Sequence, residues 1–145
     1  MKISLLGYGR MGKAIEKIAL KRGHEIVCKI DKGYNQGNLS QADVAINFSI
    51  PTAAVNNITI ALESKIPVVC GTTGWLEHYK KVTQIASYND TAFLYASNFS
   101  IGVNLFFKLN KTLAKMIQSQ AGYRKWWTDM RNMACLLYTS DAADE

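Results

Sequence analysis

Three glycines lie within six residues near the start of the chain, in the sequence GYGRMG at positions 7–12. They follow the apolar run KISLL and precede an amphipathic stretch, so they join a predicted strand to a predicted helix. In that context Gly7 permits a tight turn, Gly9 lets a pyrophosphate approach the backbone, and Gly12 lets the helix pack closely on the sheet. The free N–H groups at a helix start favour phosphate. The alternative is a tight strand-to-helix turn that binds nothing.

An acidic residue closes the second predicted strand. Asp31 follows EIVCKI and lies 19 positions after Gly12, where a carboxylate accepts hydrogen bonds from an adenosine ribose. A carboxylate there repels a 2′-phosphate and favours NADH, whereas Lys32 beside it attracts that phosphate. The pattern predicts an NAD(P)H site with a slight preference for NADH. A surface cap is the alternative role of Asp31.

Three further segments end predicted strands, and the carboxyl ends of parallel strands meet at one edge of a sheet. Phe48 packs either near the cofactor or in the core. In GTTG, residues 71–74, the threonines either bond the nicotinamide ribose or cap the next helix. Residues 96–99, ASNF, either meet the nicotinamide carboxamide or form a cap and hinge. The predicted cofactor-binding residues are Gly7, Tyr8, Gly9, Arg10, Met11, Gly12, Asp31, Lys32, Phe48, Gly71, Thr72, Thr73, Ala96, Ser97, Asn98 and Phe99. No residue is assigned a catalytic or metal-binding role.

Apolar runs and amphipathic stretches alternate along the chain. Predicted strands cover residues 2–6, 25–31, 43–49, 66–70 and 92–96, and predicted helices cover about 11–22, 51–62, 76–86 and 103–117. Residues 32–41 are polar and rich in Gly and Asn, which predicts a loop. Strands this apolar are typical of a parallel sheet covered on both faces. The sequence therefore predicts an α/β protein with a Rossmann-like, doubly wound parallel sheet.

Helical spacing of apolar residues predicts which face of each helix is buried. In the first three helices the expected core residues are Met11, Ala14, Ile15, Ile18 and Ala19, then Ala54, Val55, Ile58, Ala61 and Leu62, then Leu76, Tyr79, Val82 and Ala86. In the last helix Phe106, Phe107, Leu109 and Leu113 cannot all face the sheet. Exposed apolar residues of this kind promote association.

Composition excludes several other classes of protein. The chain has 145 residues and a net charge of +6, but its lysines are scattered and no basic stripe is interleaved with aromatics, so nucleic acid is not a predicted partner. No apolar run approaches the roughly 18 residues of a membrane span, so a membrane is not a predicted partner either. Three widely spaced cysteines, Cys28, Cys70 and Cys135, fit no metal-ligand spacing and predict reduced, buried thiols in a cytoplasmic protein.

The motifs in this order resemble the 4-hydroxy-tetrahydrodipicolinate reductase family, also called dihydrodipicolinate reductase. The matching stretches are GYGRMGK, KID, DVAINFSIPTAAVNNI, IPVVCGTTGW and ASNFSIGVNLFFKLNK, within about residues 1–118. The glycine loop is shared by many dehydrogenases, whereas VVCGTTGW together with SNFSIGVN is specific to this family. The cofactor domain of another dehydrogenase, such as a homoserine-dehydrogenase-like enzyme, and a non-catalytic nucleotide-sensing module are the alternatives.

The resemblance implies an N-terminal Rossmann domain, a second mixed α/β domain for the substrate, and a homotetramer in full-length members. It implies reduction of a cyclic dipicolinate precursor by NADH or NADPH in diaminopimelate and lysine biosynthesis. On that basis the phosphate loop maps onto residues 7–12, the ribose acid onto Asp31, and the nicotinamide contacts onto residues 71–73 and 96–99.

The final segment, residues 119–145, departs from the family. The stretch that supplies the family's proton donor and substrate contacts, E-x-H-H followed by K-x-D-x-P-S-G-T, does not occur in it. Its composition shifts abruptly and shows no clean period. We expect residues 1–118 to form the cofactor domain, the substrate domain to be absent, and residues 119–145 to be a non-native or disordered tail. The fragment is then expected to be inactive alone.

Overall fold

The computed structural model describes residues 1–117, and the predicted tail lies outside these residues. The chain divides into two compact units, Met1–Phe99 and Ser100–Glu145. The first unit holds the sheet and three α-helices, and the described part of the second unit is one helix. The predicted domain boundary at residue 118 stays a prediction.

A six-stranded sheet forms the centre of the first unit, in the order β3-β2-β1-β4-β5-β6. Strands β2, β1, β4, β5 and β6 run parallel, and only the edge strand β3 is antiparallel to its neighbour. The strand bounds are β1 Lys2–Leu6, β2 Glu25–Asp31, β3 Tyr34–Gly37, β4 Val44–Asn47, β5 Val68–Cys70 and β6 Phe93–Tyr95. The strand order reverses between β1 and β4. This arrangement confirms the predicted Rossmann-like, doubly wound sheet.

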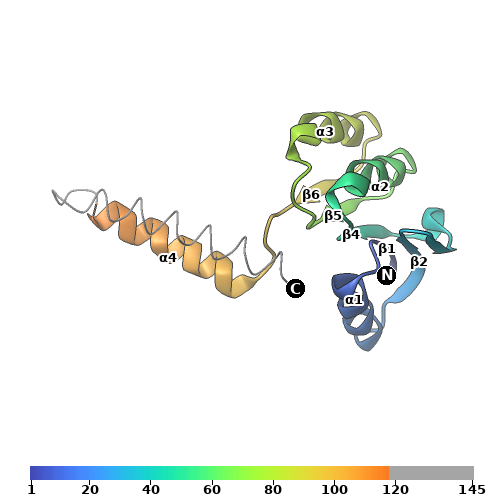
Figure 1. Ribbon diagram of the computed structural model, residues 1–145, viewed down its shortest axis with the longest axis horizontal. Coiled ribbons are helices and arrows are strands. Elements are labelled where there is room, and N and C mark those ends of the chain that lie inside the picture. The colour runs from blue at the N-terminus through green and yellow to red at the C-terminus, as the bar shows by residue number, and fades with distance from the viewer. Residues whose placement is uncertain (118–145) are drawn as a thin grey trace. The chain divides into compact units, whose positions relative to one another are not determined.

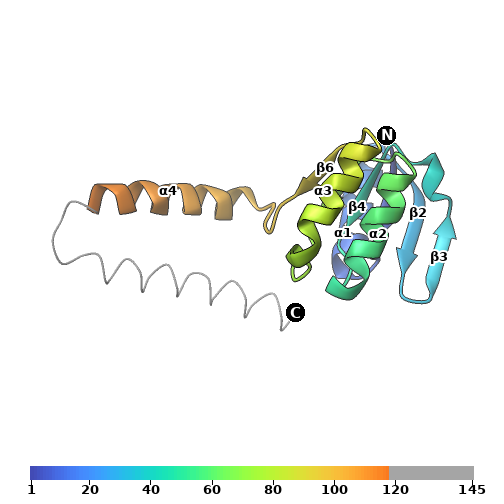
Figure 2. The same cartoon turned by 90° about the horizontal axis from the view of Figure 1, so that it is seen from above.

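Helices cover both faces of the sheet, as the buried, apolar strands require. Helix α1, Arg10–Lys21, lies on one face, and α2, Pro51–Glu63, and α3, Tyr79–Tyr88, lie on the other (Figures 1 and 2). Two short 3-10 helices, η1 Leu39–Gln41 and η2 Leu76–His78, complete the connections. Pro51 begins α2, where its missing N–H is harmless and its fixed φ suits the first turn.

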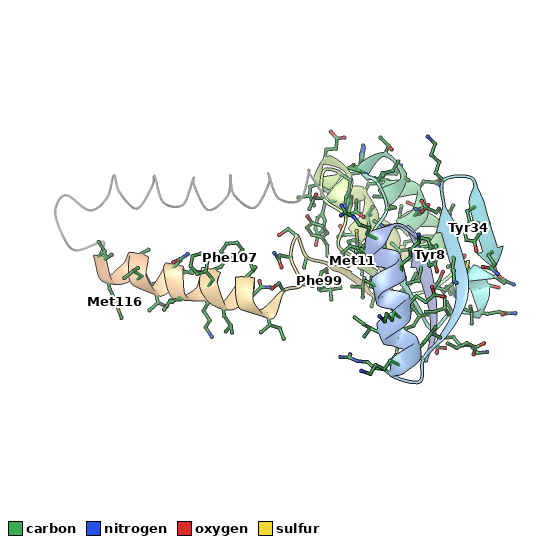
Figure 3. The ribbon with its side chains drawn as sticks, turned by 60° about the horizontal axis from the view of Figure 1, so that its bottom comes forward. Tyr8, Met11, Tyr34, Phe99, Phe107 and Met116 are labelled. Atoms are coloured by element: carbon green, nitrogen blue, oxygen red, sulfur yellow. The ribbon has the colours of Figure 1, made fainter. Side chains whose placement is uncertain are left out.

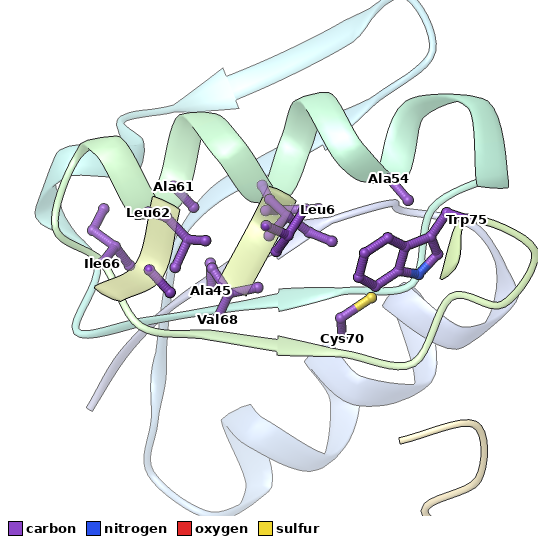
Figure 4. Close-up of a cluster of buried hydrophobic side chains, with 12 residues drawn as sticks. Leu6, Ala45, Ala54, Ala61, Leu62, Ile66, Val68, Cys70 and Trp75 are labelled. Atoms are coloured by element: carbon purple, nitrogen blue, oxygen red, sulfur yellow. The ribbon is translucent and has the colours of Figure 1, made fainter. Parts of the chain in front are cut away.

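Two apolar clusters hold these layers together. The larger lies between the sheet and α2 and α3, and Figure 4 shows Trp75 and Cys70 at one end of it and Ile66 and Leu62 at the other. The smaller lies under α1, with Ile3, Leu5 and Ala19 at its centre. The predicted face of α2 is confirmed, since its buried residues are Ala54, Ile58, Ala61 and Leu62.

The prediction of a loop over residues 32–41 was wrong, because β3 and η1 lie there. Strand β3 forms a hairpin with β2 in which Asp31 pairs with Tyr34 and Cys28 pairs with Gly37. All four β3 residues are exposed, so the strand needs no apolar alternation and its backbone pairing leaves no signal in hydropathy. Gly33, with φ of +71°, closes the turn.

The predicted buried face of α1 was right for Ala19 and wrong for Met11, Ala14 and Ile18, which are exposed, because the helix is rotated by about one residue from the predicted orientation. Gly12 and Ala19 are buried and Ile15 and Glu16 are half-buried, whereas Met11 and Ile18 are 50% and 53% exposed. The reason is the close approach of Gly12 to the turn before the helix, where a Cβ on Gly12 would overlap the carbonyl oxygen of Gly7. Gly12 therefore sets the rotation of α1 about its axis, and a glycine gives no signal in a pattern of apolar residues.

The third predicted face was right in part. Val82 and Ala86 are buried, but Leu76 and Tyr79 are 49% and 42% exposed. These two residues lie in η2 and at the first position of α3, because the chain winds a short 3-10 turn before the α-helix begins. The helix therefore presents fewer turns to the sheet than the apolar spacing predicted.

The described part of the second unit is α4, Ile101–Ile117, and none of its residues is buried. Ser100 caps it, since the Val103 N–H donates to the Ser100 hydroxyl at 3.4 Å. Phe106, Phe107, Leu109 and Leu113 are all exposed, as expected from their spacing.

Cys28 and Cys70 are buried, free thiols, as predicted, and Cys135 lies outside the described residues. Burial raises the pKa of the Cys70 thiol. Across residues 1–117, no helix is both long and apolar enough to cross a membrane. The same described residues contain no cluster of three or more potential metal ligands.

Candidate functional site

The predicted site residues of the first unit gather at the carboxyl edge of its sheet. Residues 7–12 follow β1, Asp31 closes β2, and Phe48 follows β4 directly. The β1 and β4 ends are neighbours, since the Phe48 N–H donates to the Leu6 carbonyl at 2.9 Å. This is the point where the strand order reverses, and ligands of open α/β sheets bind there.

Two of the three loop glycines are required by the fold itself. Gly7 has φ of +100°, and a Cβ on it would collide with the carbonyl oxygen of Phe48. Its N–H donates to the Ile30 carbonyl at 2.7 Å, which ties the turn to β2. Gly12 is buried against the Gly7 carbonyl. Any larger residue at either position displaces backbone atoms, so a ligand is not needed to explain these two glycines.

Gly9 is different, because no neighbouring protein atom would collide with a side chain at this position. A Cβ built on Gly9 would meet nothing within 4 Å, and its φ of −78° is ordinary for any residue. Gly9 is the N-cap of α1, yet no side chain caps this helix and its first turn contains no acidic residue. The N-terminus of α1 therefore presents uncapped amides and a partial positive charge beside open space.

Asp31 lies against the glycine loop. Its Oδ2 accepts the Tyr8 N–H at 3.1 Å, and its Oδ1 accepts the Lys32 N–H at 2.8 Å. The first bond links positions that are 23 residues apart, so the carboxylate does more than cap its own turn. Each oxygen keeps a further lone pair for a ribose hydroxyl. The structure thus brings the predicted ribose acid and the predicted phosphate loop together.

Arg10 and Met11 begin α1, and both are exposed. Figure 3 shows Met11 at the start of that helix, with Tyr8 and Tyr34 close to each other beside it. The Tyr8 and Tyr34 rings are stacked with centroids 6.2 Å apart. The cofactor contacts of these loop residues stay predictions.

Phe48 forms an aromatic contact at the other half of the edge. Its ring fills the space in front of Gly71, where a Cβ would collide with ring carbons. It also packs edge-on against Phe99, with centroids 6.1 Å apart. Phe48 is half-buried, so it is neither a deep core residue nor a free surface residue. The Phe48 ring leaves no room for a side chain at position 71, which accounts for the glycine there. The contact of Gly71 with the nicotinamide ribose stays a prediction.

Thr72 and Thr73 have different environments. Thr72 is buried, and its hydroxyl donates to the Ser49 carbonyl at 3.0 Å, which joins the loops after β4 and β5. Thr73 is exposed. The N-caps of the following helices η2 and α3 are Trp75 and His78, so neither threonine takes the capping role considered as its alternative.

Residues 96–99 follow β6 at the same edge. The Ala96 N–H donates to the Cys70 carbonyl at 3.2 Å, so the segment continues the ladder beyond β6. Ser97 is exposed and Asn98 is half-buried. Their predicted role against a nicotinamide carboxamide stays a prediction.

The sequence reading missed a buried polar network under the 71–74 loop. The Trp75 indole N–H donates to the Thr72 carbonyl at 2.6 Å, and Trp75 is 1% exposed. Asn47 is fully buried, and its Nδ2 donates to the Cys70 Sγ at 3.4 Å. Two signals were available: an asparagine ending an otherwise apolar strand, and a tryptophan directly after the GTTG segment.

The arrangement is suited to holding an anionic, sugar-bearing ligand in an extended conformation. One end of the edge offers uncapped amides and a carboxylate, and the other offers aromatic rings and hydroxyl groups. Of the two histidines, His24 precedes β2 and His78 ends η2. The groups at this edge can therefore bind and orient such a ligand.

Comparison with known structures agrees with this fold. A hyperthermophilic archaeal homoserine dehydrogenase in complex with NADPH superposes with a TM-score of 0.53 over 65% of this chain and 43% of that chain, at 14% sequence identity. At that identity the likeness is one of fold.

Comparison with known sequences identifies the family. The family model described as "Dihydrodipicolinate reductase, N-terminus" matches residues 1–99. A 4-hydroxy-tetrahydrodipicolinate reductase of Christiangramia forsetii is 53% identical over 85% of this chain and 52% of its own length. One of Cutibacterium acnes is 32% identical over 82% of this chain and 50% of its own length. The chain thus spans about half the length of these relatives, and it belongs to the dihydrodipicolinate reductase family.

Proposed function

We propose that residues 1–118 of this chain are the cofactor-binding part of a 4-hydroxy-tetrahydrodipicolinate reductase and bind NADH or NADPH. The observation that carries the proposal is the open space around Gly9. Its neighbours Gly7 and Gly12 are required by backbone packing, whereas Gly9 faces open space at an uncapped helix N-terminus. A glycine without a packing reason at that position is expected where a ligand must approach the main chain.

The described residues fit the two ends of the dinucleotide. The amides that open α1 would hold the diphosphate, and the Asp31 carboxylate would accept hydrogen bonds from the adenosine ribose. Residues 71–73 and 96–99 would lie along the nicotinamide half. A bound reduced cofactor supplies hydride, and the role of these protein groups is to orient it.

The charges at the end of β2 favour NADH slightly. A 2′-phosphate would lie near the Asp31 carboxylate, which repels it, while Lys32 is exposed next to it and attracts it. Replacing the carboxylate in Asp31→Asn should therefore weaken NADH binding and narrow or reverse the difference between NADH and NADPH. An unchanged ratio of the two affinities in that variant would count against this role of Asp31.

We also propose that the whole protein of which this chain is a part is a reductase. The names of the relatives imply an oxidoreductase of diaminopimelate and lysine biosynthesis. Residues 1–145 contain no counterpart of the family stretch that donates the proton and binds substrate. We therefore expect the chain to bind cofactor without turnover when tested alone, and homotetramers to form only in the full-length enzyme.

Calorimetry on the 145-residue chain tests this function. Titration with NADH should give a saturable heat at one equivalent, and titration with NADPH should give a somewhat weaker one. An assay of the same material with the dipicolinate-type substrate should show no oxidation of NADH. Reductase turnover by this chain would contradict the expectation that it binds cofactor without turnover. If the chain binds neither NADH nor NADPH, the proposed function is wrong.

A further inference from the structure

A cluster of side chains on the α1 face of the sheet surrounds Tyr8, the residue between the first two loop glycines. The Tyr8 ring lies 3.5 Å from the position of a Cβ on Gly12, stacks on Tyr34, and has the Lys29 Nζ 4.8 Å from its centroid. Figure 3 shows the two tyrosines next to each other at the start of α1. Tyr8 therefore contacts α1, β2 and β3 at once.

The polar end of this cluster forms a closed triangle. The Tyr8 hydroxyl donates to the Glu16 Oε2, the Lys29 Nζ donates to the Tyr8 hydroxyl at 3.4 Å, and Lys29 pairs with the Glu16 Oε1 at 2.6 Å. The Lys29 and Glu16 side chains are only 20% and 19% exposed. Glu16 is also the only acidic residue of α1. A half-buried ion pair that also fixes a tyrosine hydroxyl limits the positions that the tyrosine can adopt.

The backbone of the same tyrosine reaches the candidate site. Its N–H donates to the Asp31 Oδ2, and the residues on either side of it are Gly7 and Gly9. Glycines on both sides leave the loop little rigidity of its own. The backbone bond from Gly7 to Ile30 already holds the start of the loop to β2, and the Tyr8 side chain adds an anchor at its middle, to both α1 and β2.

We infer that Glu16 and Lys29 are positioning residues for the cofactor, which act through the Tyr8 hydroxyl to hold the glycine loop and Asp31 in the arrangement that binds the diphosphate and ribose. This inference rests on the proposed function. Neither side chain needs to touch the nucleotide. Holding a loop in its bound conformation raises affinity because less ordering remains to be done when the ligand arrives.

The directions of the pKa shifts agree with this geometry. Lys29 lowers the pKa of Glu16, and Glu16 raises the pKa of Lys29. The hydrogen bond to Glu16 raises the pKa of Tyr8. All three groups therefore keep one charge state around neutral pH, and the triangle stays intact over the pH range in which a dehydrogenase works.

Fluorescence titration of the 145-residue chain with NADH tests the inference. Glu16→Gln should weaken binding roughly threefold to fivefold, the size expected for a partly exposed ion pair. The matched control is Glu25→Gln, which makes the same charge change at the first residue of β2, at the opposite end of that strand from Asp31. The control should bind NADH as the unsubstituted chain does.

A double-mutant cycle separates positioning from a general loss of structure. In a Tyr8→Phe background the hydroxyl is gone, so Glu16→Gln should weaken NADH binding no further. Circular dichroism at the titration temperature checks that each variant is folded. If Glu16→Gln is not folded, Lys29→Met breaks the same triangle and should weaken binding in the same way.

The outcomes are distinct. Tight NADH binding by the unsubstituted chain together with equal affinity in Glu16→Gln would overturn the positioning role and leave the proposed function standing. The same loss with and without the Tyr8 hydroxyl would also overturn it, because Glu16 would then act by another route. No binding by the unsubstituted chain would overturn the proposed function and this inference with it.

Discussion

At the scale of single residues, the three glycines of the loop after β1 stand at their positions for different physical reasons. Gly7 is fixed by its positive φ and the Phe48 carbonyl, and Gly12 is fixed by the Gly7 carbonyl. Gly9 has neither constraint. The three positions therefore separate what folding requires from what ligand binding requires.

Alanine substitutions at the three glycines should divide accordingly. Gly9→Ala should lower the free energy of unfolding by less than about 1 kcal/mol, since nothing collides with the added atom and alanine is only a poorer N-cap than glycine. Gly7→Ala and Gly12→Ala should each lower it by about 1–3 kcal/mol, because backbone atoms must move. Chemical denaturation measures all three. Equal destabilisation by Gly9→Ala and Gly7→Ala would mean that Gly9 too has a packing role.

The same Gly9→Ala variant should lose NADH binding while it keeps most of its stability, since the new methyl group occupies the space in front of the amides. Gly23→Ala is the control for nucleotide binding, because Gly23 ends the turn after α1 and no atom lies within 4 Å of its Cβ position. Retention of NADH binding by Gly9→Ala would contradict the role given to the open backbone.

At the scale of secondary-structure elements, the Glu16–Lys29 pair joins α1 to β2, and its effect on stability should depend on pH. The pKa of Glu16 is lowered from 4.5, so its contribution is present above that value and is lost as the pH falls through the lower, folded pKa. The pKa of Lys29 is raised from 10.5, so its contribution is present below that value and is lost as the pH rises through the folded pKa.

The difference in melting temperature between the unsubstituted chain and Glu16→Gln should therefore be constant from about pH 6 to 9. It should shrink as the pH is lowered below about 4.5, because Glu16 becomes protonated and resembles glutamine. Differential scanning calorimetry across this range measures it. A difference that grows on acidification would show that the pair does not stabilise the fold in its charged form.

The hairpin that pairs β3 with β2 supplies another test at this scale. Gly37 has φ of +87°, and a Cβ on it would collide with the Val27 carbonyl. Gly37→Ala should release β3 and lower stability by about 1–3 kcal/mol. Gly23→Ala, with φ of +76° and open space around the added atom, separates the strain of a positive φ from the collision. Hydrogen exchange at residues 34–37 should rise only in Gly37→Ala, and protection there in both variants would contradict the account.

At the scale of the whole molecule, the described part of the second unit leaves apolar surface uncovered. Five large apolar side chains of α4 are 44–78% exposed, namely Ile101, Leu105, Phe106, Phe107 and Leu109. Surface of this kind promotes association. We therefore expect the average mass of the 145-residue chain to rise with concentration.

Static light scattering measures this association. Leu109→Lys should reduce the rise in mass with concentration, whereas Thr112→Lys, which adds the same charge at an exposed polar position, should reduce it less. A stable monomer at all concentrations would contradict the expectation.

The sequence predicted most of this fold because its main signals are periodic. Apolar strands, the amphipathic α2 and the glycine motif all leave local patterns. These patterns predicted the parallel sheet and predicted that residues 7–12, Asp31 and Phe48 lie at its carboxyl edge. Three features have no local pattern. Strand β3 is held by backbone pairing at an exposed edge. The rotation of α1 is set by Gly12, and the triangle around Tyr8 joins residues from three elements that only the fold brings together.

The central claim is that the open backbone at the start of α1, with Asp31, holds the diphosphate and ribose of a nicotinamide cofactor. An NMR titration of the isotope-labelled chain with NADH tests it most directly. Amide shifts should saturate together and concentrate at residues 7–12, Asp31 and Lys32, with weaker changes at 71–73. Saturating NADH that leaves these amides unmoved, or that shifts only residues away from this edge of the sheet, would contradict the account.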